Sequence, residues 1–345
     1  MTAFANHSSP RIIQPQQRIS IAPMMDWTTR DYRYFARLFN PHVWLYSEMV
    51  TTGAIIHGDK ARHLDFNASE QPLVLQLGGS NPKDLALCSQ IAQDWGYCEV
   101  NLNVGCPSDR VQNNKIGACL MAEPELVAEC IDAMQQAVDI PVTVKHRIGI
   151  DDMQSYEEML HFVDTVAQTG CSHFIVHARI ALLKGLSPKE NRDIPPLRYD
   201  DVYRLKQERP NLFIEINGGI QTFEQVNQQL QRVDGVMVGR AAYHDPYLLA
   251  QSMMLWQQTP PDRFEIMQQF MPYIEKRLSE GAPLGIITRH ILGLFQHMPG
   301  ARKWRQALSG GTAKSITDVQ QAIDAIQAAI ERTEAYTAAT SQTTA

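Results

Sequence analysis

Residues 141–170, PVTVKHRIGIDDMQSYEEMLHFVDTVAQTG, contain one complete β–α unit and determine the fold that we expect. The unit opens with a strand candidate, Pro141–Arg147, whose first residues are apolar, as in a parallel strand buried on both faces. A Ser-x-x-Glu capping box, formed by Ser155 and Glu158, predicts the start of a helix, and Gly170 marks its end. The segment is therefore a strand, a loop and a helix, in that order.

The same unit recurs along the first 250 residues. The other strand candidates are Arg18–Met24, Val43–Met49, Leu73–Gly79, Cys98–Val104, His173–Arg179, Leu212–Gly218 and Gly235–Arg240. The other helix candidates are Thr29–Phe39, Asn81–Trp95, Pro124–Val138, Tyr199–Glu208 and Thr222–Leu230. Eight such repeats over about 240 residues predict an α/β fold, a (β/α)8 TIM barrel in residues 1–250. A doubly wound sheet is the alternative, but its glycine-rich turn would follow the first strand instead of coming late, at Asn217–Gly219.

The alternation of strands and helices stops after about Leu249. The remaining candidates are all helices: Phe264–Leu278, Leu284–His297, Ala301–Leu308 and Ser315–Tyr336. They predict a small C-terminal helical domain over residues 251–336. Residues 337–345 contain Ala, Thr, Ser and Gln, and we expect a flexible tail that frays.

Composition excludes several classes of protein. The chain has 345 residues, 44% hydrophobic and 20% charged, which is ordinary for a globular protein and unlike a disordered one. It has no run of 18 apolar residues for a membrane span, and Met1–Pro15 lacks the apolar region of a secretory signal. The 6 cysteines are scattered and form no C-x-x-C pair. We therefore expect a cytoplasmic, monomeric protein that binds no metal.

Polar residues stand where several of the expected strands end. Gln76, Lys145, His177 and Asn217 would converge on one end of a barrel, where the loops after the strands meet. An amine, an imidazole and two amides gathered there would be left unpaired, at a cost, unless a polar ligand bound them. The convergence predicts such a ligand.

The last two loops of the expected barrel indicate the charge of that ligand. Gly218, Gly219 and Gly239 let backbone N–H groups approach closely, Arg240 adds a cation, and a helix follows each loop. Phosphate binding after the last two strands is a recurring use of this fold. The alternative for Asn-Gly-Gly is a tight turn without a ligand. Because both loops carry the pattern, we favour a phosphate.

A planar cofactor that bears a phosphate would fit these groups. Lys145 could stabilise the anion of a reduced isoalloxazine ring, while Gln76 and Asn217 could pair with the ring edges. The loop at Pro23, Met24 and Met25 offers backbone groups and apolar contact. Lys145 could instead form a Schiff base, as lysines do in barrel aldolases, but amide-rich surroundings favour a flavin.

Cys106 is the candidate for the reaction itself. It lies in a Gly-Cys-Pro turn just after the fourth strand candidate, so its thiol would face the open end of the barrel. The other cysteines are interpreted as small buried hydrophobic residues. Because a free thiol is mostly protonated at neutral pH, Cys106 could act as an acid as well as a nucleophile. Spacing does not decide between these roles.

Several motifs resemble those of the flavin-dependent tRNA-dihydrouridine synthases. They are Ala22–Thr28, Asn101–Ser108, Val144–Gly149, Val176–Arg179, Asn217–Ile220 and Val238–Arg240. The A subfamily is the nearest, on the further motifs Glu48–Ala54, Gly185–Arg192 and Gly293–Gln296. The resemblance extends from about Ile19 to Leu308.

The resemblance implies a reaction and a set of roles. FMN, reduced by NADPH, would pass hydride to C6 of a uracil in tRNA, and Cys106 would protonate C5. Asn103 would lie beside the uridine, and the substrates would be uridines 20 and 20a of the D-loop. The residues that would hold FMN are Pro23, Met24, Met25, Gln76, Lys145, His177, Asn217, Gly218, Gly219, Gly239 and Arg240.

A tRNA substrate requires basic surface, and two segments supply it despite the net charge of -6. Gly281–Thr317 has no Asp or Glu, and its Arg302 and Arg305 would share one helix face. Lys189 and Arg192 lie in the loop after the sixth strand candidate. A solvated helix face is the alternative for any one such segment.

Two other functions remain open. A flavin oxidoreductase for a free pyrimidine could use the same barrel, but it would leave the basic helical domain without a purpose. An RNA-binding module that has lost its chemistry is a further alternative, and the Cys106, Lys145 and His177 set argues against it.

Overall fold

The computed structural model describes residues 17–108, 115–309, 311 and 313–343. Two segments considered in the sequence lie outside the described residues: Met1–Pro15, and the last two residues of the predicted tail. The chain divides into two compact units. One contains the residues up to Arg30 together with His42–Gly239, and the other contains Asp31–Pro41 and the residues from Arg240 onward.

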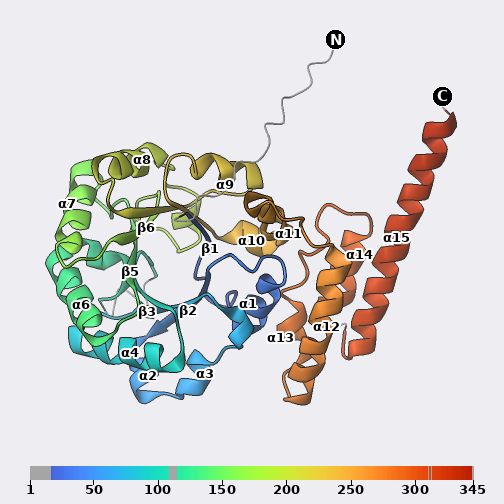
Figure 1. Ribbon diagram of the computed structural model, residues 1–345, viewed down its shortest axis with the longest axis horizontal. Helices are drawn as coiled ribbons and strands as arrows, with labels where there is room; N and C mark the ends of the chain where they lie inside the picture. Colours follow the sequence, from blue (N-terminus) through green and yellow to red (C-terminus); the bar gives the residue numbers. More distant parts are fainter. Residues whose placement is uncertain (1–16, 109–114, 310, 312, 344–345) are drawn as a thin grey trace, which may run out of the picture. The chain divides into compact units, whose positions relative to one another are not determined.

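The first unit is built on a parallel sheet of eight strands (Figure 1). The strands are β1 (Arg18–Ile21), β2 (Leu45–Thr51), β3 (Leu73–Gly78), β4 (Glu99–Val104), β5 (Val142–Arg147), β6 (His173–His177), β7 (Phe213–Asn217) and β8 (Gly235–Val238). Their order is β1-β8-β7-β6-β5-β4-β3-β2, so each strand lies beside its neighbour in sequence. A parallel bridge between Ser20 and Trp44 joins the two edges of the sheet. The expected (β/α)8 TIM-barrel-like architecture is thereby confirmed.

Helices follow the strands of this unit. They are α2 (Thr52–His57), α3 (Lys60–Leu64), α4 (Pro82–Trp95), α6 (Pro124–Ala137), α7 (Tyr156–Ala167), α8 (Tyr199–Glu208) and α9 (Phe223–Gln229), with the short 3-10 helices η1 (Ala68–Glu70), η2 (Gly117–Ala122) and η3 (Glu190–Arg192). The expected capping box is present, because the Ser155 hydroxyl accepts from the Glu158 amide and the Glu158 carboxylate accepts from the Ser155 amide.

Polar side chains fill part of the barrel interior. Arg18 of β1 donates to Glu99 of β4 and to Glu215 of β7, at 2.9 Å in each case, although neither strand is a neighbour of β1. These side chains therefore meet across the inside of the barrel. Because side chains alternate along a strand, Asn101 and Asn103 point the same way as Glu99. The interior face of β4 thus carries a carboxylate followed by two amides.

The second unit is helical. Its elements are most of α1 (Arg30–Arg37), then α10 (Arg240–His244), α11 (Tyr247–Gln251), η4 (Ser252–Trp256), α12 (Arg263–Ser279), α13 (Leu284–Thr288), α14 (Ala301–Leu308) and α15 (Ile316–Thr343). Asp31 of α1 accepts hydrogen bonds from Tyr273 at 2.7 Å and from Arg277 at 2.8 Å. Phe35 packs on Phe270, with ring centroids 5.0 Å apart. These contacts explain why α1 belongs with helices that follow it by more than 200 residues.

Two helix predictions in this unit differ from the structure. The helix expected over Leu284–His297 ends at Thr288, and turns follow it. Gly293 lies in these turns, and because a Cβ there would lie 2.3 Å from the His244 carbonyl oxygen, the chain approaches His244 at a point where only glycine fits. By contrast, α15 continues to Thr343, through residues expected to form the tail. Its last residues include several alanines, which favour helix.

Among the residues that the structure describes, no helix is long and apolar enough to cross a membrane.

Candidate active site at the carboxyl end of the barrel

The turn that carries Cys106 follows β4 and is fixed on both sides. The Asn103 side-chain oxygen accepts from the backbone N–H groups of Gly105 at 3.1 Å and Cys106 at 3.0 Å. The Arg147 Nε donates to the Gly105 carbonyl at 2.9 Å. The Cys106 carbonyl accepts from the Ala118 amide at 2.9 Å. Cys106 itself is half-buried, so the residue stays partly accessible in a turn whose backbone is held.

Arg147 connects this turn to the loop after β6. Its Nη1 donates to the carbonyl oxygens of Ile180 and Asn191, at 3.0 Å each, and its side chain is 2% exposed. Burial, together with the nearby cations Arg192 and Arg179, lowers its pKa to about 10. Arg147 was not among the site residues predicted from the sequence. The signal was present, because Arg147 lies two residues after Lys145 and so points to the same face of β5.

Lys145 and Asn217 meet inside the barrel, as expected. The Lys145 Nζ donates to the Asn217 side-chain oxygen at 3.2 Å, and the Asn217 amide donates to the Met237 carbonyl at 2.8 Å. The protein around the half-buried Lys145 shields it from water and, with the charge of Arg147, lowers its pKa to about 8. Lys145 is thus still mostly a cation at neutral pH, although it loses its proton more readily than an ordinary lysine.

His177 ends β6 and is a neutral imidazole. Burial lowers its pKa well below the usual value, and the charges of Arg147, Lys145, Arg179 and Arg192 lower it further. A neutral ring has one N–H donor and one acceptor. The cations that act on it lie on β5 and in the loop after β6, so positive charge accumulates at this end of the barrel. Such a site favours an anionic ligand.

Gln76 lies inside the barrel with its amide in hydrogen bonds. Its Nε2 donates to the Asn101 oxygen and its Oε1 accepts from the Asn103 Nδ2, at 2.8 Å each. Gln76 is 1% exposed and Asn103 is 8% exposed. The structure therefore brings the predicted flavin contact Gln76 and the predicted uridine contact Asn103 together through a direct hydrogen bond.

The turn after β7 requires its two glycines. Gly218 has φ of 114° and Gly219 has φ of 71°, a region that side chains rarely adopt. A Cβ on Gly218 would lie 2.7 Å from the His177 ring, and one on Gly219 would lie 2.4 Å from Leu197. Gly239 follows β8, and Arg240 is the first residue of α10. The close packing of Gly218 on His177 leaves no space for any larger residue.

The loop after β1 holds the remaining predicted cofactor contacts. The Met24 carbonyl accepts from the Trp27 amide at 3.1 Å and from the Thr28 amide at 2.9 Å, which forms a tight turn after Pro23. Met24 packs against the apolar cluster inside the barrel. Met25 is 58% exposed. An apolar side chain this exposed is available for contact with a planar ligand.

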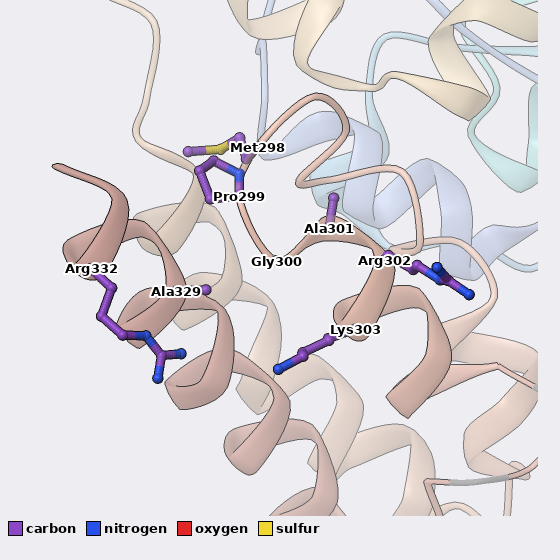
Figure 2. A pocket seen from close by; sticks show the side chains of 8 residues that line it. All are labelled: Met298, Pro299, Gly300, Ala301, Arg302, Lys303, Ala329 and Arg332. Carbon is purple, nitrogen blue, oxygen red and sulfur yellow. The ribbon is translucent and has the colours of Figure 1, made fainter. Parts of the chain in front are cut away.

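The predicted tRNA contacts lie in both units. Lys189 and Arg192 are exposed, on and beside η3 in the barrel unit. In the helical unit, Arg302 lines a groove of about 620 Å³ between α14 and α15, and Arg305 instead donates to the Gln296 side chain at 2.7 Å. Figure 2 shows the groove; Lys303 and Arg332 extend from its two helices, and Arg302 points the other way. All three charged residues of its lining are cations.

Comparison with known proteins shows the family to which this chain belongs. The model of a family described as dihydrouridine synthase matches residues 20–332. The chain belongs to the dihydrouridine synthase family. The tRNA-dihydrouridine(20/20a) synthase of Shewanella oneidensis is 60% identical over 304 residues, 87% of this chain and 90% of its own. Proteins of the same name from Synechocystis sp. and Vibrio cholerae are each 56% identical, covering 90% and 89% of this chain and 94% and 95% of their own. The chain is thus an enzyme of the dihydrouridine synthase family, as the motifs indicated.

Proposed function

We propose that this enzyme reduces uridine to 5,6-dihydrouridine at positions 20 and 20a of the tRNA D-loop, with Cys106 as the proton donor. The observation that carries the proposal is the Gly105–Cys106 turn, fixed by Asn103 and Arg147 beside the half-buried Lys145. The names of the Shewanella, Synechocystis and Vibrio relatives support the positions in tRNA.

The cofactor in this proposal is FMN, which would take electrons from NADPH and supply a hydride to C6 of the uracil. The residues fit such a group. Lys145 is a cation inside the barrel whose one hydrogen bond within the described part of the chain goes to Asn217, so further N–H donors remain for an anionic ring. Gly218 and Gly219, both at positive φ, form a tight turn after β7, in a loop where this fold commonly binds a phosphate. The other residues proposed to hold FMN are Pro23, Met24, Met25, Gln76, His177, Asn217, Gly239 and Arg240.

Cys106 would donate its proton to C5 of the uracil. Hydride addition at C6 leaves negative charge on the conjugated carbonyl system, and a positioned acid quenches it at C5. The transfer leaves a thiolate on Cys106. Lys145 and Arg147 lie close enough to interact with that charge, and both interactions are favourable. The same two cations therefore stabilise the product state of the acid.

The tRNA in this proposal contacts both units. The target base must be unstacked to reach the turn at Cys106. Exposed Lys189 and Arg192 would bind phosphates near the barrel opening, and the groove with Arg302 and Lys303 would bind phosphates in the helical unit. Arg305 stays a predicted contact of the same kind. We further propose that the enzyme acts in the cytoplasm as a monomer.

The variant Cys106→Ala tests the acid. We expect FMN to remain bound and NADPH-dependent flavin reduction to stay within about twofold of wild type, because Cys106 takes no part in that step. Dihydrouridine formation should fall about 100-fold or more, the typical contribution of a general acid. Flavin absorbance and mass spectrometry of digested, initially unmodified tRNA measure the two steps.

Cys98→Ala is the matched control, since Cys98 is also half-buried but precedes β4, at the opposite end of that strand from the Cys106 turn. Wild-type product formation by Cys106→Ala would exclude Cys106 as the acid. Comparable wild-type activity on free uridine and on tRNA would instead favour a pyrimidine reductase.

A further inference from the structure

A continuous chain of side-chain hydrogen bonds runs through the barrel interior to the Cys106 turn. Thr143 Oγ1 lies 2.8 Å from Glu99 Oε1 and 2.9 Å from Asn101 Nδ2. Asn101 Oδ1 accepts from Gln76, and Gln76 Oε1 accepts from Asn103, at 2.8 Å each. Asn103 Oδ1 then accepts from the two N–H groups of the turn. Four side chains on β3, β4 and β5 thus connect the Glu99 carboxylate to the backbone of Cys106.

The two ends of this chain determine its direction. A carboxylate is only an acceptor, so the Thr143 hydroxyl donates to Glu99 and its oxygen is left to accept from Asn101. A backbone N–H is only a donor, so the Asn103 oxygen must face the turn. The orientation of a side-chain amide is usually ambiguous. Here both ends require the same orientation of all three amides.

The carboxylate end is firmly held. Arg18 donates to Glu99 from Nη1 at 2.9 Å and from Nη2 at 3.3 Å. Glu99 is 2% exposed, Thr143 is 1% exposed and Asn101 is fully buried. Water therefore cannot replace a missing partner without entering the barrel. Thr143 has one other acceptor, the Val100 carbonyl at 3.5 Å, which is more distant and uncharged.

We propose that Thr143, Asn101 and Glu99 are positioning residues for the acid: they orient the Asn103 amide, which in turn fixes the peptide groups of the Cys106 turn. The proposal rests on the proposed role of Cys106 as proton donor. Reversal of the Asn103 amide would put its NH2 group against the two backbone donors and open the turn. Because proton transfer requires close alignment, a shift of about 1 Å at the thiol costs up to about 100-fold in rate.

The test variant is Thr143→Val in the full-length enzyme, because it removes the hydroxyl and keeps the shape of the side chain. Thr143→Ser restores the hydroxyl and serves as the rescue. Ser89→Ala is the matched control, since Ser89 is a buried residue of the same unit whose hydroxyl donates to the Leu85 carbonyl inside α4. It reports any general effect of losing a buried hydroxyl.

The first measurement is hydrogen exchange of the peptide that spans residues 101–108, on the protein without cofactor. Pro107 has no amide hydrogen, and the amides of Gly105 and Cys106 are those bound to Asn103. We expect Thr143→Val to speed their exchange about tenfold, while Thr143→Ser and Ser89→Ala leave it unchanged. Unchanged exchange in Thr143→Val would overturn the proposal.

The second measurement separates the two half-reactions by stopped-flow absorbance of the flavin. We expect Thr143→Val to slow flavin oxidation by tRNA about tenfold or more, to leave reduction by NADPH within about twofold, and Thr143→Ser to recover most of the loss. An equal loss in both half-reactions would show that the chain acts through Gln76 on the cofactor, and would also refute the proposal. If the wild-type enzyme forms no dihydrouridine, the proposed function fails. If Thr143→Val is instead oxidised by tRNA at the wild-type rate, only the positioning role of Thr143 is refuted.

Discussion

Lys145 shows how one residue balances burial against charge. The protein around it lowers its pKa to about 8, and the neighbouring Arg147 contributes to the shift. The ordinary value is about 10.4, so between these two pH values the unfolded chain binds more protons and the unliganded fold gains stability as pH rises. Below pH 8 the barrel holds the cation at a cost. A bound anion would stabilise that cation and offset the cost, which connects the shifted pKa of Lys145 to ligand binding.

The affinity for FMN should therefore depend on pH. If a bound anionic flavin restores the ordinary pKa of Lys145, the dissociation constant for FMN should rise about tenfold between pH 7 and pH 9, as the free enzyme loses the proton. Lys145→Met should remove this dependence. Quenching of flavin fluorescence measures the affinity, and Lys83→Met, at an exposed position of α4, is the control. The same pH dependence in Lys145→Met and wild type would contradict this role.

Sequence reasoning found the residues at the strand ends and missed those that hold them. Lys145 and Asn217 were selected because each lies at or near the end of a strand, and the structure joins them by a hydrogen bond. Asn101 and Thr143 lie deeper in the barrel; Asn101 opens the motif Asn101–Ser108 but was given no role of its own, and Thr143 lies in no motif. The alternation of polar and apolar residues in β4 was a usable signal. The partner of each polar side chain depends on the register between strands, which the sequence does not reveal.

At the scale of the element, the turn between β7 and α9 combines strain and close contact. Gly218 and Gly219 both have positive φ, and both lie against neighbouring side chains. Tyr199 of α8 donates to the Gly218 carbonyl at 2.6 Å and so fixes the turn from outside. The elements around the site thus hold the backbone in one conformation before any ligand binds.

Gly218→Ala should weaken FMN binding more than it weakens the fold. The added Cβ would lie 2.7 Å from the His177 ring and would displace it. Gly170→Ala is the control, because Gly170 also has positive φ, of 90°, but has nothing within 4 Å of its Cβ position. Both variants should lose about 1 kcal/mol of stability to backbone strain. Only Gly218→Ala should raise the dissociation constant for FMN, by about tenfold or more. Equal affinities in the two variants would show that the packing of Gly218 on His177 does not matter for FMN binding.

Element boundaries were predictable where local signals exist. Tyr199–Glu208 and Ala301–Leu308 match α8 and α14, and α4 begins at its Asn81 cap, whose side chain accepts from the Lys83 and Asp84 amides. Two short helices, α2 and α3, lie in the loop after β2 and were not expected. The turns after Thr288 were also missed, and they include the close approach of Gly293 to His244, two segments far apart in sequence. Contacts of that kind leave no local pattern.

At the scale of the whole molecule, the two units carry different parts of the proposed function. The barrel unit contains Cys106, Lys145 and the hydrogen-bond chain from Glu99 to the turn. The helical unit contains the groove lined by Arg302, Lys303 and Arg332, and within the described part of the chain no acidic side chain forms an ion pair with Lys303 or Arg332. Chemistry and phosphate binding should therefore respond separately to substitution. The sequence predicted basic helices here, but not the contribution of Arg332, which comes from a helix face that looks like solvated surface.

The double variant Lys303→Ala with Arg332→Ala tests this division. Each cation that binds a phosphate releases counterions, so the slope of log affinity against log salt should decrease by about 0.7 to 0.9 per residue lost. We expect the dissociation constant for tRNA at low salt to rise about tenfold, while kcat at saturating tRNA and flavin reduction by NADPH stay within about twofold. Lys276→Ala is the control, because Lys276 is exposed on α12 of the same unit but outside the groove. A salt slope that matches wild type would remove the groove from the tRNA-binding surface, and a fall in kcat with unchanged affinity would place these cations in the catalytic step instead.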